Sequence, residues 1–227
     1  NNVGQIGPDA GSDIRRIALN GLSVKGISAS DYFTSEEGTS FFVTTDGKAF
    51  GLGSNASLQL AVAATSEVTS RSFPGQIANL QGVIGVSSRR DTSFAVMADG
   101  SVFGWGSNDY CQLGTATSGQ CAPSPTPVRV AAPTRLRKVA FGGLSTLGLD
   151  DQGGVWSWGA GYAALGRSGD GNVPGLVGAI PPTRDIAAGL YHGAIVSTSG
   201  AVWTWGMNYS GQMGTGSFDQ NDLNGNF

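Results

Sequence analysis

Alternating apolar and polar positions recur along the chain and predict short β-strands. Side chains of a strand point alternately to opposite faces, so apolar residues at every second position are typical of a strand with one buried face. Each alternating stretch leads into a turn that contains glycine, which adopts positive φ angles at little cost. We therefore expect a series of β-hairpins. Their leading strands carry Phe41/Val43, Phe94/Val96, Leu147/Leu149 and Ala194/Val196, and their turns carry Gly47, Gly100, Gly153 and Gly200.

The strand after each turn carries large residues at two positions that share one face. All five tryptophans of the chain fall in these two columns, and the residue between the columns is small. We expect the large residues of one sheet to pack against the small-residue face of the next. A ligand-stacking ladder or a light-absorbing cluster is the functional alternative. The first column is Phe50, Phe103, Trp156 and Trp203, the second is Leu52, Trp105, Trp158 and Trp205, and the small residues are Gly51, Gly104, Ser157 and Thr204.

The hairpins belong to a longer repeat. Asn1 and Asn208 occupy equivalent positions, which gives repeats of about 52 residues. A further pair of strands is expected ahead of each hairpin, from "LSVKGISA", "LQGVIGVS", "LRKVAF" and "TRDIAAG". Repeats near 50 residues with four strands each indicate propeller blades. We predict an all-β fold, a single partial β-propeller over 1–227, with repeats at approximately 1–54, 55–107, 108–160 and 161–207 and with 208–227 starting the next.

The repeat follows a definite template, of which the clearest copies are "AAGLYHGAIVSTSGAVWTWGMNYSGQMGTG" and "DGSVFGWGSNDYCQLG". This template resembles the regulator of chromosome condensation repeat family. The resemblance implies a seven-bladed β-propeller, of which this chain would supply about four four-stranded blades. The missing blades are expected from sequence outside 1–227 or from another chain, because an open arc would expose large apolar faces. The opening "NNVGQIG", without a starting methionine, favours a fragment or a processed form.

Composition narrows the partners that we expect. The net charge is -3 with 13 basic residues, and the arginines are scattered, so we expect no nucleic-acid partner. No run of 18 apolar residues is present, so we expect no membrane insertion. Charged residues make up only 13% of the chain. Together with the cysteine pair described below, this favours an extracellular or cell-surface protein, with a cytoplasmic or nuclear protein as the alternative.

The sequence offers little for catalysis. His192 is the one histidine and stands at the template position that Thr39, Thr92 and Ser145 occupy in the other repeats, so we expect a packing role. Glu36 and Glu37 are adjacent in a predicted loop rather than paired across a site. The stretch "FDQNDLNGN" lacks the spacing of a calcium loop. We therefore predict no enzyme, no cofactor and no metal site.

Cys111 and Cys121 lie ten residues apart, with no further cysteine and no nearby histidine to complete a zinc site. We expect a disulfide in an oxidising compartment, and two free thiols are the alternative. Asn55 and Asn208 begin Asn-x-Ser sequences and are candidates for glycosylation. Both also stand at the asparagine of the repeat template, which is the alternative explanation.

Because we expect no catalytic site, we look for function in the surface loops. The segment ahead of each hairpin varies most between repeats, and the repeat geometry places these segments on one face. We expect this face to bind protein, with ordinary exposed loops as the alternative. The function that we predict is a non-enzymatic interaction or structural module of a larger extracellular protein. The resemblance implies the alternatives of an intracellular regulator, such as a small-GTPase exchange factor or a chromatin or ubiquitin-pathway adaptor, or of a secreted inhibitor. The candidate binding residues are Tyr32, Phe33, Arg89, Arg90, Leu144 and Tyr191.

Overall fold

The computed structural model describes residues 16, 17, 19, 21–32, 35–61, 69–77, 80–115 and 121–218. The chain forms two compact units, and each is described by itself. Unit 1 comprises Asn1–Asn108 and Ala122–Arg129, and unit 2 comprises Asp109–Cys121 and Val130–Phe227. No helix in the described part of the chain is long and apolar enough to cross a membrane.

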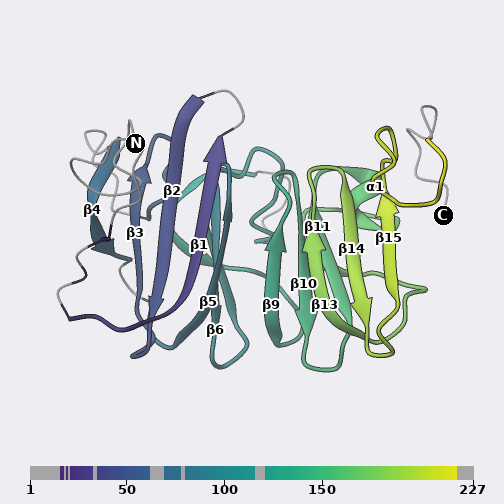
Figure 1. The fold of residues 1–227 in the computed structure, drawn as a ribbon, viewed down its shortest axis with the longest axis horizontal. Helices are drawn as coiled ribbons and strands as arrows, with labels where there is room; N and C mark the ends of the chain where they lie inside the picture. The colour runs from purple at the N-terminus through teal and green to yellow at the C-terminus, as the bar shows by residue number, and fades with distance from the viewer. Residues whose placement is uncertain are drawn as a thin grey trace. The chain divides into compact units, whose positions relative to one another are not determined.

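Unit 1 contains two four-stranded antiparallel sheets in which each strand pairs with the next along the chain (Figure 1). The first sheet consists of β1 (Val24–Tyr32), β2 (Ser35–Thr44), β3 (Ala49–Ser54) and β4 (Ser70–Gln76). The second consists of β5 (Val83–Arg89), β6 (Thr92–Met97), β7 (Val102–Gly106) and β8 (Ser124–Arg129).

Unit 2 repeats this plan. Its first sheet consists of β9 (Leu136–Phe141), β10 (Ser145–Asp150), β11 (Val155–Gly159) and the short β12 (Gly175–Leu176), and the single-turn helix α1 (Tyr162–Leu165) follows β11. Its second sheet has three strands among the described residues, β13 (Thr183–Ala188), β14 (His192–Ser197) and β15 (Val202–Gly206).

The predicted all-β fold and its hairpins are confirmed. β2–β3, β6–β7, β10–β11 and β14–β15 pair antiparallel across the predicted turns. The turn glycines all have positive φ, from 79° at Gly47 to 89° at Gly200. Glycine is favoured there because a Cβ strains this conformation.

The position predicted for the remaining strands is wrong in part. The sequence placed a pair of strands ahead of each hairpin, whereas the complete sheets have one strand before the hairpin and one after it. The strand after the hairpin is the outer one, and it is hard to recognise because it carries proline: Pro74 in β4 and Pro125 in β8. Proline cannot donate to a ladder and is tolerated at a sheet edge.

The two aromatic columns differ in burial. Leu52, Trp105 and Trp158 of the second column are fully buried, and Trp205 is 6% exposed. The first column is only half-buried, and Trp203 is 46% exposed. The expectation that all five tryptophans pack between sheets is therefore wrong for Trp203. The equivalent Trp156 pairs with Leu176 of β12, and β15 has no such outer neighbour among the described strands.

The small residues between the columns make room for the chain's own loops. Ser157 Oγ donates to the carbonyl of Leu165 at 2.7 Å, and Thr204 Oγ1 donates to the carbonyl of Met213 at 2.9 Å. The segment after the third strand thus folds back over this face of its own sheet. This contact is a second reason for small residues there, besides the packing between sheets that the sequence predicts.

Candidate protein-binding face

Each sheet has one end at which a turn and a loop lie together. In three of the described sheets the residue that begins the second strand pairs with the last glycine of the third: Thr92 with Gly106, Ser145 with Gly159 and His192 with Gly206. The turn before the second strand therefore lies beside the loop after the third strand. We call this end of a sheet its turn end. Backbone hydrogen bonds join the two segments: Ser107 to Asp91 at 2.9 Å, Ala160 to Leu144 at 3.1 Å and Met207 to Tyr191 at 2.9 Å.

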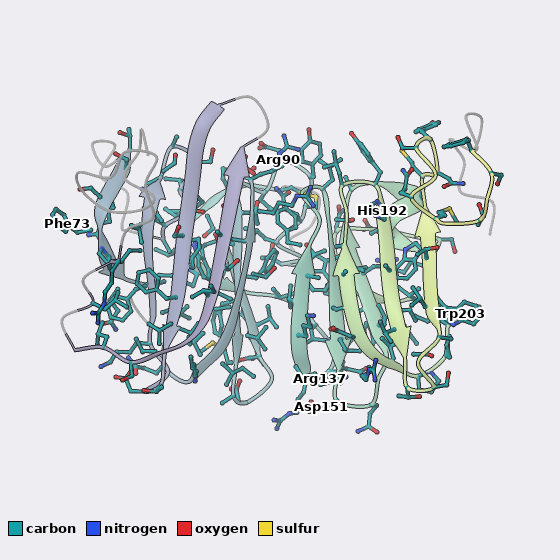
Figure 2. All side chains as sticks on the ribbon, viewed as in Figure 1. Phe73, Arg90, Arg137, Asp151, His192 and Trp203 are labelled. Atoms are coloured by element: carbon teal, nitrogen blue, oxygen red, sulfur yellow. A yellow bond between two sulfur atoms is a disulfide. The ribbon has the colours of Figure 1, made fainter. Side chains whose placement is uncertain are left out.

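In unit 1 three of the predicted binding residues are described, and they lie at or beside the turns that precede the second strands. Tyr32 ends β1, and Phe33 lies outside the described residues. Arg89 ends β5, and Arg90 follows it in the turn with φ at 53°; both side chains are half-buried. The two sheets contact each other here, since Ser30 Oγ donates to the carbonyl of Arg90 at 3.5 Å. Arg90 is labelled in Figure 2.

In unit 2 the turn ends bring Leu144 and Tyr191 to adjacent turns. The turns are so close that a Cβ on Gly142 would lie 2.0 Å from the carbonyl oxygen of Gly189. The Leu144 side chain is half-buried, and Tyr191 is 40% exposed. The His192 ring lies against Gly189, where a Cβ would come within 2.1 Å of the ring. Close packing therefore requires glycine at both 142 and 189.

Two tyrosines of unit 2 that the sequence analysis missed lie in loops that follow a third strand. Tyr110, in the loop after β7, is 47% exposed, and Tyr209, in the loop after β15, is 37% exposed. Both stand one or two residues after the template asparagine, in "NDY" and "NY". This recurrence was the signal that could have revealed them. Exposed tyrosines are typical anchors of protein interfaces because they bring large contact area at low entropic cost.

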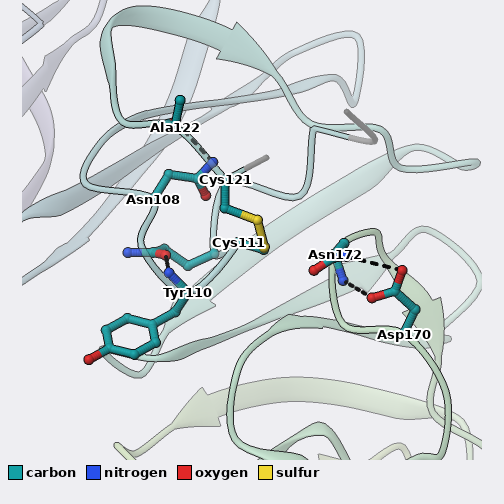
Figure 3. The surroundings of a disulfide bond; sticks show 8 residues. Asn108, Tyr110, Cys111, Cys121, Ala122, Asp170 and Asn172 are labelled. Atoms are coloured by element: carbon teal, nitrogen blue, oxygen red, sulfur yellow. Dashed lines mark hydrogen bonds between the residues drawn. A yellow bond between two sulfur atoms is a disulfide. The ribbon is translucent and has the colours of Figure 1, made fainter. Parts of the chain in front are cut away.

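Unit 2 also has a cavity of about 400 Å³ at its turn ends, beside Tyr110. Two exposed aspartates, Asp109 and Asp170, line it together with glycine-rich backbone. Asp170 accepts hydrogen bonds from the backbone N–H and the side-chain Nδ2 of Asn172, at 2.9 and 3.2 Å (Figure 3). An aromatic ring beside carboxylates suits a partner that presents hydrogen-bond donors or a basic side chain.

Arg167 fixes the loop that carries Asp170. Its Nη2 donates to the carbonyls of Ser157, Asp170 and Val173 at 2.9, 2.9 and 3.1 Å. Partial burial lowers the pKa of the guanidinium, although it stays charged at every physiological pH. Arg167 thus fixes the loop that forms one wall of the cavity. Among the described residues, no three His, Cys, Asp or Glu side chains are grouped as they would be to hold a metal ion.

Cys111 and Cys121 are joined as a disulfide in the structure, with Cα atoms 4.8 Å apart, and Cys111 also lines the cavity (Figure 3). The bond joins the two ends of residues 111–121, directly after Tyr110. In the chain-entropy model such a bond stabilises the fold by restricting the unfolded chain.

The asparagines of the two Asn-x-Ser sequences close their own loops. Asn55 Oδ1 accepts from the N–H of Leu60 at 2.9 Å, and Asn208 Oδ1 accepts from the N–H of Met213 at 3.0 Å. Asn208 Nδ2 also donates to the carbonyl of Ser217 at 2.8 Å. The two asparagines are only 4% and 6% exposed. The structure thus gives both a role in the repeat, which is the alternative to glycosylation.

Two segments of the chain match models of a known repeat family. The model described as "Regulator of chromosome condensation (RCC1) repeat" matches residues 99–149, and a second model of the same description matches residues 184–212. The chain is 30% identical to the human RCC1-like G exchanging factor-like protein over 145 residues, which are 63% of this chain and 31% of that protein. It is 31% identical to human Protein RCC2 over 135 residues, 58% of this chain and 25% of that protein. The chain thus spans less than a third of either relative.

Solved structures show the same fold. The crystal structure of human WBSCR16 superposes with a TM-score of 0.79 at 24% identity, over 96% of this chain and 58% of that one. The structure of Prp20p from Saccharomyces cerevisiae, reported together with its binding properties to Gsp1p and histones, superposes with a TM-score of 0.66 at 22% identity, over 79% of this chain and 46% of that one.

Proposed function

Because the chain belongs to the regulator of chromosome condensation repeat family, we propose that it is part of a non-enzymatic, protein-binding propeller that acts as a regulator through its turn ends. The relatives support this alternative better than the extracellular module that the low charge suggested, since they include an exchange-factor-like protein and Protein RCC2. The proposal treats the four sheets as consecutive parts of a single propeller.

The observation that carries the proposal is that three exposed tyrosines of unit 2 lie in a turn before a second strand or in a loop after a third strand. Tyr110, Tyr191 and Tyr209 are between 37% and 47% exposed. Tyrosine is a residue type that is enriched among the anchors of protein interfaces, because its ring brings a large contact area at low entropic cost. The cavity beside Tyr110 adds a concave, acidic feature that would accept a protruding basic or donor side chain of a partner.

A small GTPase is the partner class to test first. One relative is named for exchange-factor likeness, and the structurally similar Prp20p was reported with its binding to Gsp1p. Histones, the second partner in that report, provide the comparison. Basic histone tails would complement Asp109 and Asp170 at the cavity.

The test is a binding titration of the chain against purified Gsp1p and against purified histones. We expect measurable binding to one of them, and we expect the triple variant Tyr110→Ala/Tyr191→Ala/Tyr209→Ala to weaken it at least tenfold, because buried tyrosine anchors dominate interface energies. Phe73→Ala is the matched control, since this ring is 65% exposed on β4, away from the turn ends. Equal losses in both variants, or no loss in the triple variant, would exclude the turn ends as the binding face.

A further inference from the structure

The outer strand of the second sheet carries two hydroxyl residues that are each followed by proline. β8 reads "SPTPVR", so Ser124 precedes Pro125 and Thr126 precedes Pro127. The full sequence contains no other serine or threonine followed by proline. β8 pairs with β7 and is the last strand of its sheet, so its other edge has no partner among the described strands. Both sequences therefore lie on an edge strand.

A β-bulge takes Thr126 out of the ladder between β7 and β8. Gly106 of β7 pairs with Ser124. The next pair is Gly104 with Val128, so one residue of β7 faces three residues of β8. Proline has no N–H to donate and is tolerated at bulges and sheet edges. The three residues without a Cα partner on β7 are Pro125, Thr126 and Pro127.

The two hydroxyl groups differ in their access to solvent. Ser124 is 9% exposed, and its Oγ donates to the carbonyl of Thr126 at 2.7 Å. The Thr126 side chain is exposed, and its Oγ1 makes no hydrogen bond with another described residue. Ser124 therefore stabilises the bulge, whereas the hydroxyl of Thr126 is available to an enzyme.

Arg129 places a cation three residues after Thr126. Its side chain is exposed and forms no ion pair or hydrogen bond with another described residue. The residue three positions after Ser124 is Pro127 instead. Thr126 alone is thus followed by both a proline and an arginine at these two positions.

Protein kinases select a hydroxyl through the residues around it. A kinase pocket without an acceptor for the N–H of the following residue favours proline, because any other residue would bury an unpaired N–H. An anionic group of the kinase that contacts the third residue after the hydroxyl favours arginine, through a charge-assisted hydrogen bond. Thr126 meets both conditions, and Ser124 meets only the first.

We propose that Thr126 is a phosphorylation site for a proline-directed serine/threonine kinase. Thr126 Oγ1 attacks the γ-phosphorus of MgATP, the bond from that phosphorus to the β–γ bridging oxygen breaks, and ADP leaves. The hydroxyl proton passes to the catalytic aspartate of the kinase and then to solvent. The phosphate adds a charge of about −1.5 to −2 at pH 7 to the edge of the sheet. The inference is independent of the proposed function, because it depends only on β8.

The test is a phosphorylation time course of the folded chain with a recombinant cyclin-dependent kinase and MgATP. Intact mass measures the phosphate that is added, and fragmentation mass spectrometry locates it. We expect phosphate on Thr126, which Thr126→Val abolishes and Ser124→Ala keeps, with circular dichroism showing that both variants are folded. A chain without phosphate on Thr126 would overturn the proposal.

A peptide of residues 122–132 measures how far the fold limits access to Thr126. We expect initial rates for the folded chain and the peptide to agree within about tenfold, because the bulge already presents an extended, unpaired segment. A chain that reacts more slowly than this, or a peptide that does not react, would overturn the proposal.

Arg129→Ala and Arg184→Ala form a matched pair for the same assay. Arg184 is an exposed arginine of β13 and is remote in sequence from Thr126. We expect Arg129→Ala to lower kcat/KM about tenfold, the effect of one charge-assisted hydrogen bond, and Arg184→Ala to leave it unchanged. Equal effects of the two variants would overturn the assignment to this class of kinase.

Discussion

The loop of residues 55–61 in unit 1 allows a prediction about two hydrogen bonds that share one carbonyl oxygen. Gln59 is 4% exposed, and its carbonyl oxygen accepts from Trp105 Nε1 and from Ser93 Oγ. The Trp105 ring is fully buried and makes an edge contact with Phe41, with ring centroids 6.1 Å apart. The perturbations are Trp105→Phe, Ser93→Ala and the double variant.

Each single variant leaves the carbonyl one of its two donors. Ser93→Ala removes the longer bond, at 3.1 Å, and should lower the free energy of unfolding by about 1 kcal/mol. Trp105→Phe removes the 2.7 Å bond and part of a fully buried ring, and should cost about 2–3 kcal/mol. In the double variant both donors are gone from a buried acceptor, which adds a desolvation penalty of about 1–2 kcal/mol beyond the sum of the single effects.

The assay is urea unfolding followed by far-ultraviolet circular dichroism for the four proteins of this cycle. We expect a coupling free energy of about 1–2 kcal/mol, with the double variant less stable than additivity predicts. Ser101→Ala provides a control hydroxyl, because Ser101 Oγ is exposed and donates to Asp99, two residues away in its turn. When Ser101→Ala is combined with Trp105→Phe, the loss of unfolding free energy should equal the sum of the two single losses. Additivity within about 0.3 kcal/mol for the Ser93 cycle would refute the shared-acceptor argument.

Two further predictions concern unit 2. Reduction of the Cys111–Cys121 disulfide should lower the free energy of unfolding by about 2–3 kcal/mol through the freed loop, and thermal melts with and without dithiothreitol should show it; the Cys111→Ser/Cys121→Ser variant should melt like the reduced protein and should not respond to the reductant. The pKa of Asp185 is lowered chiefly by its hydrogen bond with Lys138, so its contribution is present above the ordinary aspartate pKa and is lost as the pH falls through the lowered value. Both side chains are about half exposed, so Lys138→Met should reduce the loss of unfolding free energy between pH 5 and pH 2 by only about 0.2–0.5 kcal/mol, as measured by urea unfolding; an unchanged loss would contradict this pairing.

The hairpins could be predicted from the sequence because local rules determine them. Alternation, a glycine with positive φ and the paired columns of large residues all act within about 20 residues, and each hairpin was found where these signals coincide. The outer strands could not be placed as well. β4 and β8 are partly exposed, carry proline and lie far along the chain from their partners, so neither periodicity nor propensity indicates them.

The candidate binding face was predicted only in part, for a different reason. Variable segments ahead of the hairpins pointed to Tyr191, which is exposed, and to Leu144 and Arg90, which are half-buried. Tyr110 and Tyr209 were missed because they belong to the polar stretch after the third strand. In the sequence that stretch was only a repeated part of the template. The antiparallel pairing of the second and third strands shows that it lies at the same end of the sheet as the turn before the second strand.

The loop of residues 109–114 contributes to both the proposed binding face and the packing in unit 2. On its outer side Tyr110 is 47% exposed beside the acidic cavity. On its inner side the carbonyl of Gln112, two residues on, accepts from Trp158, and the disulfide from Cys111 tethers the segment between them. A partner that orders Tyr110 therefore acts on the loop that holds the Trp158 ring. If a partner favours the same arrangement of this loop that holds the Trp158 ring, linkage requires that a variant with a weaker Trp158 contact also bind that partner more weakly, even though Trp158 is fully buried.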